Sequence, residues 1–340
     1  MVLQKPNAKK TSLEQWAQDM GDGVMRWLIG LTRHWSKRRD ILRNNYRLGH
    51  HYLKLGKTSD AVLRFKIVTW MDPMRPDGWY FLGCSTLAHG DRVAAVSAFT
   101  QALRIKPDYE EAAYMLAIAS GKDMPAEALP KKMPVSLAQG HFEEIAPGFT
   151  REQIEVYQYR GHTLLAEAVR AALVPGRIDH VVLEPGVGSG LCGALLRDVS
   201  AHLTGVDFSA AMLTEAVKLQ DAQGKKTYDA LINREIHEFL PDMADDAFDV
   251  VLAAGLISYV GEADALVAQV ARVLKPGGLF AFTADAMDGQ GFQLDTAAGR
   301  FCFSRSYLEG LAANNRLTVL RFEEAEIYPE YKAWLCVFRK

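Results

Sequence analysis

A glycine-rich turn between an apolar segment and a helical segment contains the first residues that could do chemistry. Residues 178–183 are apolar and β-branched enough to predict a strand, and this strand leads into Glu184-Pro-Gly-Val-Gly-Ser-Gly190. Glycines at such a turn let the backbone approach a ligand closely, and the helix that follows begins with free amide groups. The arrangement therefore predicts a nucleotide-type ligand at the turn.

A second acid follows at the end of the next predicted strand. Residues 202–206 form that strand, and Asp207 comes directly after it, at a place where an acid can accept hydrogen bonds from ribose hydroxyls. Residues 188–193 also satisfy GxGxxG, so a nicotinamide oxidoreductase stays open as an alternative. Against it, a proline and a glycine have already ended the strand before that motif, and Glu184 stands at the tip of the strand.

An acid followed by GxGxG, with a second acid after the next strand, resembles class I S-adenosylmethionine-dependent methyltransferases. The resemblance covers residues 150–340 and continues through predicted strands at 228–233, 248–253, 279–283, 317–327 and 332–338. It implies an α/β fold with a Rossmann-like, mostly parallel seven-stranded sheet, S-adenosylmethionine as cofactor and S-adenosylhomocysteine as product. The cofactor-binding residues that it implies are Glu184, Gly186, Gly188, Gly190, Asp207, Phe208, Met212, Glu235, Ile236, Ala254 and Tyr259.

Methyl transfer by in-line displacement needs mainly orientation and a water-poor pocket. A base is needed only when the acceptor must lose a proton, and we nominate His162 and Tyr259 as proton acceptors. Arg160 and Arg300 suit a carboxylate or phosphate on the acceptor. By analogy with the fold, the substrate-binding residues expected are Tyr157, Tyr159, Arg160, Arg300, Phe301 and Tyr307.

An internal repeat organises the first part of the chain. Residues 45–73 align with residues 79–107 at a constant offset of 34 residues. The equivalent pairs are Gly49 and Gly83, Ala61 and Ala95, Phe65 and Phe99, and Pro73 and Pro107. Small residues opposite an aromatic residue predict two helices that pack closely, with a proline ending the second helix. The pattern resembles the tetratricopeptide repeat.

The sequence predicts four parts: a helical extension over 1–40, two such repeats with a capping helix over 41–120, a proline-containing linker over 121–140, and the methyltransferase domain over 141–340. As a whole, the chain resembles bacterial predicted methyltransferases that carry tetratricopeptide repeats ahead of the catalytic domain. We expect the repeats to contact a protein partner or a second copy of the chain.

The composition limits the remaining function classes. With 340 residues, 49% hydrophobic and 24% charged, the chain suits two globular domains rather than a disordered protein or a coiled coil. It shows no run long enough for a membrane span and no apolar signal segment, so a cytoplasmic location is expected. The four cysteines lack the spacing of a zinc site, and no metal is expected.

The charge of the chain is divided unevenly. Residues 1–150 carry 21 Lys and Arg against 15 Asp and Glu, whereas residues 151–340 carry 18 against 26. An acidic catalytic part disfavours a nucleic-acid substrate. The expected function is methyl transfer to a small molecule or a peptide side chain, and a non-catalytic cofactor-binding or scaffold protein that works through its repeats is the alternative.

Overall fold

The structure is a computed structural model that describes residues 37–220 and 224–340. The chain divides into two compact units, of which the first ends at Ala112 and the second runs from Ala113 to Lys340. The predicted helical extension over 1–40 lies outside the described residues, except that 37–40 are helical. The division differs from the predicted parts, since the segment interpreted as a linker falls inside the second unit.

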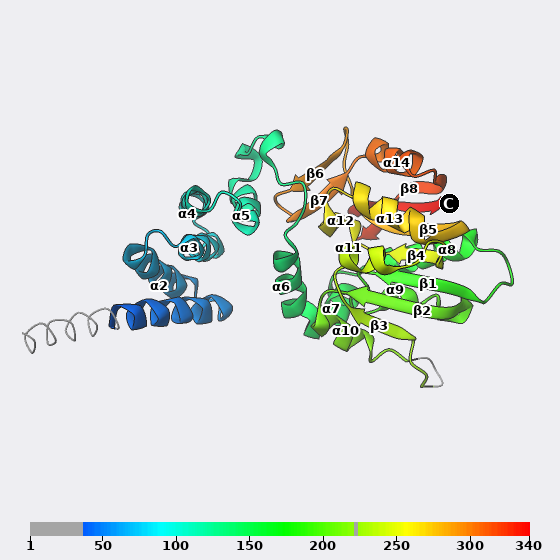
Figure 1. Ribbon diagram of the computed structural model, residues 1–340, viewed down its shortest axis with the longest axis horizontal. Helices are drawn as coiled ribbons and strands as arrows, with labels where there is room; N and C mark the ends of the chain where they lie inside the picture. The colour runs from blue at the N-terminus through cyan, green and yellow to red at the C-terminus, as the bar shows by residue number, and fades with distance from the viewer. Residues whose placement is uncertain (1–36, 221–223) are drawn as a thin grey trace, which may run out of the picture. The chain divides into compact units, whose positions relative to one another are not determined.

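The first unit is built from consecutive helices (Figure 1). They cover residues 37–54, α2 (Thr58–Met71), α3 (Pro76–Ala88) and α4 (Arg92–Ile105), and α5 (Glu110–Ser120) follows. A Cβ on Gly49 would lie 2.7 Å from the ring of Phe65, and a Cβ on Gly83 would lie 2.5 Å from the ring of Phe99. Both rings are fully buried, so each glycine lets one helix of a pair contact the aromatic residue of the other.

Gly83→Ala should therefore lower the free energy of unfolding of the helical unit by about 1 to 3 kcal/mol, because the new methyl group overlaps Phe99. At an open helical site the same change stabilises, since alanine is the better helix former. Gly310→Ala in α14 (Arg305–Asn314) is the matched control, because nothing lies within 4 Å of its Cβ position. Urea unfolding followed by circular dichroism measures both. A stabilised Gly83→Ala variant would contradict the close helix contact.

The second unit contains a mostly parallel sheet, as the sequence predicts. Strands β3 (Ala230–Asn233), β2 (Ser200–Asp207), β1 (His180–Pro185), β4 (Phe248–Ala253) and β5 (Leu274–Ala286) lie side by side and run parallel. Strand β9 (Tyr331–Arg339) pairs antiparallel with β5, and β8 (Thr318–Tyr328) pairs antiparallel with β9. These seven strands are the predicted ones.

The sheet nevertheless has nine strands, because a hairpin joins the end of β5. Strand β5 continues to Ala286, and its last two residues pair with β7 (Arg300–Phe303), which pairs with β6 (Phe292–Asp295). The prediction of a seven-stranded sheet is therefore wrong by two short strands, β6 and β7. Their pairing with β5 brings together segments that are distant in the sequence, and no local pattern predicts such pairing.

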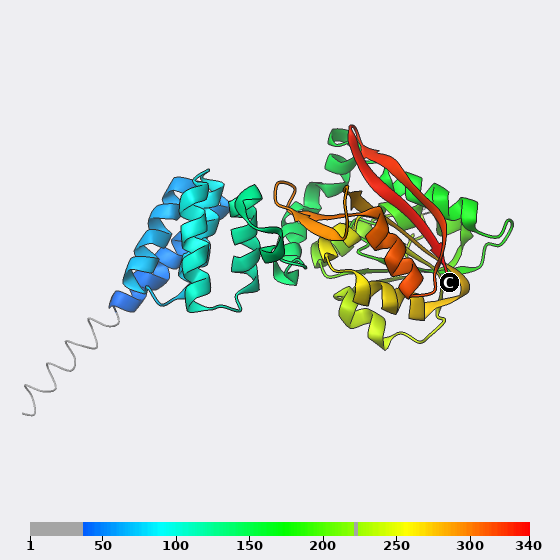
Figure 2. The same cartoon turned by 90° about the horizontal axis from the view of Figure 1, so that it is seen from above.

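Helices cover both faces of the sheet (Figures 1 and 2). On one face, α8 (Gly161–Ala172) and the short α9 (Leu191–Ala194) pack against residues of β1, β2, β4 and β9. On the other face lie α11 (Ile236–Phe239), α12 (Ile257–Val260), α13 (Asp264–Val273) and α14. Helix α10 (Ala210–Ala216) follows β2. The helices thus leave the carboxyl ends of the parallel strands as the site for a ligand.

Residues 121–160 are more ordered than the linker that was predicted over 121–140. They form turns at Gly121–Asp123 and Ala126–Ala128, helix α6 (Val135–Ile145), a turn at Ala146–Gly148, α7 (Phe149–Arg151) and a π-helical turn at Glu152–Val156. The chain then breaks before α8, where Gln158 has a positive φ of 54°. Met124, Leu129 and Met133 pack on the core of the second unit, so this segment belongs to that unit.

The described residues contain neither a membrane-spanning helix nor a cluster of metal ligands. Within residues 37–220 and 224–340, no helix has the length and apolar character needed to cross a membrane. In the same ranges, no group of three or more His, Cys, Asp or Glu side chains could hold a metal ion.

Candidate functional site

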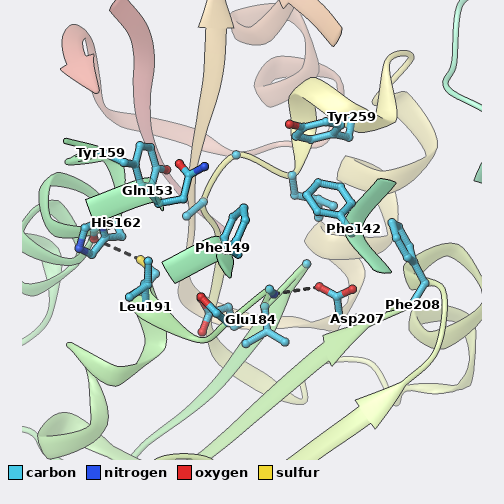
Figure 3. Close-up of a pocket in the computed structure, with 18 of the residues that line it drawn as sticks. Phe142, Phe149, Gln153, Tyr159, His162, Glu184, Leu191, Asp207, Phe208 and Tyr259 are labelled. Carbon is cyan, nitrogen blue, oxygen red and sulfur yellow. Dashed lines mark hydrogen bonds between the residues drawn. The ribbon is translucent and has the colours of Figure 1, made fainter. Parts of the chain in front are cut away.

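Two adjoining cavities lie at the carboxyl ends of the parallel strands, and they share Gly186, Asp207, Phe208, Leu256 and Tyr259. The first cavity continues toward α8 and α9. Its further lining residues include Phe142, Phe149, Gln153, Tyr159, His162, Glu184, Gly188, Ser189, Cys192, Ala254 and Tyr328 (Figure 3). The second cavity continues toward α6, α11 and α12, and its lining includes Val135, Ala138, Arg234, Glu235, Ile236 and His237.

The glycine turn adopts a backbone conformation that side chains oppose. Gly186, Gly188 and Gly190 have φ values of 65°, 54° and 85°, in the left-handed region. A Cβ on Gly190 would also lie 2.9 Å from the ring of Tyr228. Gly186 and Gly188 line the first cavity, whereas Gly190 does not and acts by shaping the turn.

Asp207 holds this turn against the end of β2. Its Oδ2 accepts a hydrogen bond from the Gly188 amide at 2.8 Å, and its Oδ1 accepts one from the Ser209 amide at 2.8 Å. Burial raises the pKa of Asp207, and these two bonds oppose the rise. Each oxygen keeps a second lone pair, so the carboxylate can bind a ligand while it supports the turn.

Glu184 lies at the end of β1 with only 2% of its surface exposed. The hydroxyl of Tyr228 lies 2.6 Å from its Oε2, and the Gly193 amide also donates to it. No Lys or Arg is among the described residues that line the first cavity. Burial therefore raises the pKa of Glu184 to about 8. Tyr228 was not predicted from the sequence as part of the site.

Glu235 and Ile236, two of the cofactor-binding residues that the resemblance implies, line the second cavity. Glu235 accepts hydrogen bonds from the amides of His237 and Glu238 at 2.7 and 3.1 Å, so it caps α11. The pKa of Glu235 is lowered overall. Burial acts to raise it, but hydrogen bonds from the side chain and amide of His237 outweigh the effect of burial. Ile236 and Phe208 line the same cavity. Met212, in contrast, is fully buried in α10 and lines neither cavity, so the structure does not bring it to the site.

Both nominated proton acceptors line the first cavity. The Nδ1 of His162 is buried without a partner, and its Nε2 lies 3.2 Å from the Thr163 hydroxyl. Burial lowers the pKa of His162, which keeps the imidazole neutral. Burial raises the pKa of Tyr259, so its hydroxyl keeps its proton. Tyr159 stacks on His162 with ring centroids 5.5 Å apart.

The other residues predicted to bind the acceptor lie elsewhere. Tyr157 and Arg160 are exposed and line neither cavity. Arg300 forms an ion pair with Asp285, and its guanidinium lies 5.1 Å from the ring centroid of Tyr331. Phe301 is fully buried, because alternate residues of β7 point into the core. The hydroxyl of Tyr307 donates to Asp264 at 2.6 Å and accepts from the Ala263 amide, so this residue joins α14 to α13.

Residues 121–160, called the covering segment below, contribute cavity-lining residues that were not predicted from the sequence. Figure 3 shows Phe149 near Glu184, with Gln153 and Tyr159 on one side and Phe142 on the other. The segment is attached to α10, because Glu143 Oε1 accepts a hydrogen bond from the Ala210 amide at 2.7 Å. The hydroxyl of Tyr328 donates to Gln153 Oε1 at 2.9 Å. The only signal for these residues was the two aromatic side chains of 142 and 149, set among polar residues.

Comparison with known proteins identifies the central part of the chain. Residues 183–282 match the family model described as a methyltransferase domain. The chain is 38% identical over 97 residues to phosphatidylethanolamine N-methyltransferase of Cereibacter sphaeroides, a match that covers 28% of this chain and 46% of that protein. It is 34% identical over 123 residues to the malonyl-acyl-carrier-protein O-methyltransferase of Enterobacter lignolyticus, covering 36% and 45%. The chain thus spans less than half the length of these two relatives.

A solved structure shares the fold. The cyclase SpnF is 15% identical, with a TM-score of 0.50, over 62% of this chain and 97% of that one, and this likeness shows the fold alone. The family match and the curated relatives together support a methyltransferase domain over residues 183–282. The two relatives are named for different acceptor atoms, so they leave the acceptor open.

Proposed function

We propose that this protein transfers a methyl group from S-adenosylmethionine to a small molecule or a peptide side chain by in-line displacement. One observation carries the proposal: a glycine turn in the left-handed conformation lies in one cavity with two buried acids, Glu184 and Asp207. When bound, the cofactor supplies an electrophilic methyl group on a sulfonium. The protein's own residues orient the partners and exclude water.

The residues of the two cavities fit this cofactor. Ser189 Oγ is buried without a partner and lines the first cavity, so it suits the carboxylate of the methionine part. Glu184 suits its ammonium group, and Asp207 suits the ribose hydroxyls. Glu235 and Ile236 suit the adenine. The faces of Phe142, Phe149 and Tyr259 favour a cation, as the sulfonium is.

The acceptor side of the first cavity favours an uncharged reacting group. Gln153, Tyr159 and Tyr328 line it, and its described lining offers no Lys or Arg to pair with an anion. Arg300, which we expected to hold a carboxylate or phosphate, is occupied by Asp285. His162 is neutral and is the better proton acceptor for a hydroxyl acceptor, whereas Tyr259 retains its own proton and serves to position its neighbours.

We also propose that the helical unit is of the tetratricopeptide type and binds a protein partner or a second copy of the chain. Two helix pairs at an offset of 34 residues support this proposal, as do the equivalent contacts of Gly49 with Phe65 and of Gly83 with Phe99. A non-catalytic scaffold remains the alternative function, in which the cofactor binds and no methyl group is transferred.

The first test is calorimetric binding of S-adenosylhomocysteine, followed by incubation with methyl-labelled S-adenosylmethionine and cell lysate. We expect micromolar binding and label in the small-molecule fraction. Label on proteins would identify a side-chain acceptor, and binding without transfer would favour the scaffold. Absence of S-adenosylhomocysteine binding would overturn the proposed function.

Ser189→Ala tests the placement of the methionine carboxylate. Its hydroxyl has no partner in the ligand-free protein, so its loss should leave stability unchanged and should weaken S-adenosylhomocysteine binding roughly fivefold, the value of one hydrogen bond. Binding of 5′-methylthioadenosine, which lacks the carboxylate, should not change. Equal weakening of both ligands would contradict this placement.

A further inference from the structure

Glu184 and Tyr228 form a buried pair in which the number of protons can be counted. The hydroxyl of Tyr228 lies 2.6 Å from Glu184 Oε2 and 3.0 Å from the carbonyl oxygen of Gly190. The Gly190 carbonyl accepts only, and an ionised carboxylate also accepts only, whereas a tyrosine hydroxyl has one proton. One of the two contacts therefore lacks a proton unless Glu184 carries one.

A protonated Glu184 satisfies every group of this pair. Its O–H donates to the Tyr228 oxygen, and the Tyr228 O–H then donates to the Gly190 carbonyl. Both side chains are buried, with 2% and 6% of their surfaces exposed. The Gly190 carbonyl also accepts from the Ala194 amide at 3.4 Å, so the main cost of ionising Glu184 is a buried charge without a cation, and the neutral arrangement is the stable one.

The described surroundings of Glu184 supply no positive charge. Asp207 on β2 and Cys192 on α9 act on it, and His162 on α8 lines the same cavity. Asp207 adds negative charge and raises the pKa of Glu184 further. Burial raises the pKa of the Cys192 thiol and lowers that of His162, so both are neutral. Only the Gly193 amide joins Tyr228 as a donor to this carboxyl among the described residues.

We propose that Glu184 carries a proton in the ligand-free protein, that Tyr228 positions it, and that the proton leaves for bulk solvent when the ammonium group of the methionine part binds. The inference rests on the proposed function. The O–H bond of Glu184 breaks, the carboxylate pairs with the ammonium, and the Tyr228 hydroxyl turns from the Gly190 carbonyl to donate to the carboxylate. The pair thus selects ligands that carry an ammonium group.

Proton release makes binding depend on pH. Since the free carboxyl has a pKa of about 8, affinity for S-adenosylhomocysteine should rise about tenfold per pH unit below that value and level off near it. Binding near pH 7 should release about one proton.

Calorimetry in phosphate and in Tris measures this number, because the two buffers take up protons with different enthalpies. The wild-type protein should release about one proton per S-adenosylhomocysteine near pH 7. Glu184→Gln should bind more weakly, with no release and no dependence on pH between about 6 and 8. The ligand 5′-methylthioadenosine, which lacks the ammonium group, should bind the wild type without release.

Tyr228→Phe separates positioning from packing, since it keeps the ring against Gly190 and removes the hydroxyl. The carboxylate loses a donor, so S-adenosylhomocysteine affinity should fall about tenfold and the pH profile should move to higher pH. An unmoved profile would show that Tyr228 is only structural. Wild-type binding without proton release, or equal release by Glu184→Gln, would overturn the inference alone. Absence of binding would overturn the proposed function with it.

Discussion

Replacing Asp207 by alanine should lower the free energy of unfolding by about 2 to 6 kcal/mol and weaken S-adenosylhomocysteine binding roughly 100-fold. The stability loss follows because the amides of Gly188 and Ser209 lose their acceptor in a buried place, at about 1 to 3 kcal/mol each. The affinity loss has two causes. The ribose hydroxyls lose their acceptor, and the glycine turn becomes looser. Urea unfolding without ligand and calorimetric titration measure the two effects.

Asp198→Ala is the control for Asp207→Ala, because it removes an exposed acid that pairs with Arg170 on the surface. Such a pair contributes little, so its loss should change neither stability nor affinity appreciably. Unchanged affinity in Asp207→Ala would show that the ribose binds elsewhere. Weakened affinity at unchanged stability would show that Asp207 touches the ligand without supporting the turn.

The sheet and the glycine turn were predictable because their signals are local. Strand β4 has the predicted bounds, 248–253, since a short apolar run entered through acids is typical of a buried parallel strand. The turn at 186–190 was predicted from its glycine spacing, and Asp207 was predicted from its place directly after the next strand. Neither pattern predicted the hydrogen bond by which Asp207 holds the turn, because it joins residues that are 19 positions apart.

The acceptor side of the cavity was less predictable, because its residues are brought together by contacts between segments that are far apart in the sequence. Arg300 was predicted to bind the acceptor, because the sequence does not show that Asp285 on the neighbouring strand pairs with it. Phe301 lies in a strand whose existence depends on pairing with β5, and that pairing turns its ring into the core.

The covering segment was misinterpreted for a related reason. Prolines at 125, 130 and 134 break helical periodicity, and this predicted a linker. The segment is ordered instead by apolar side chains that pack on the core and by the bond from the Ala210 amide to Glu143, which spans 67 residues. Its contribution of Phe142 and Phe149 to the cavity follows from those contacts.

Glu184→Gln should make the ligand-free protein more stable than wild type at pH 8, by roughly 2 to 4 kcal/mol, although it weakens cofactor binding. The native carboxyl keeps its proton up to a pKa of about 8, whereas the unfolded chain loses it near 4.5. The stabilising contribution of the native proton is therefore complete below about pH 4.5 and is lost as pH rises toward 8. Glutamine does not titrate, so the advantage of the variant should grow over this range and vanish near its lower end.

Urea unfolding of both proteins at about pH 5 and pH 8, without ligand, measures this growing difference. Glu167→Gln on α8 removes the same charge from an exposed position and should show no such growth. A Glu184→Gln variant that is equally stable or less stable at pH 8 would mean that the native carboxylate is already ionised there, with Tyr228 donating to it. The expected gain arises because a carboxyl buried without a cation destabilises the empty site, and the ammonium of the bound cofactor removes that cost. Stability and affinity should thus change in opposite directions at this residue, whereas at Asp207 they should fall together.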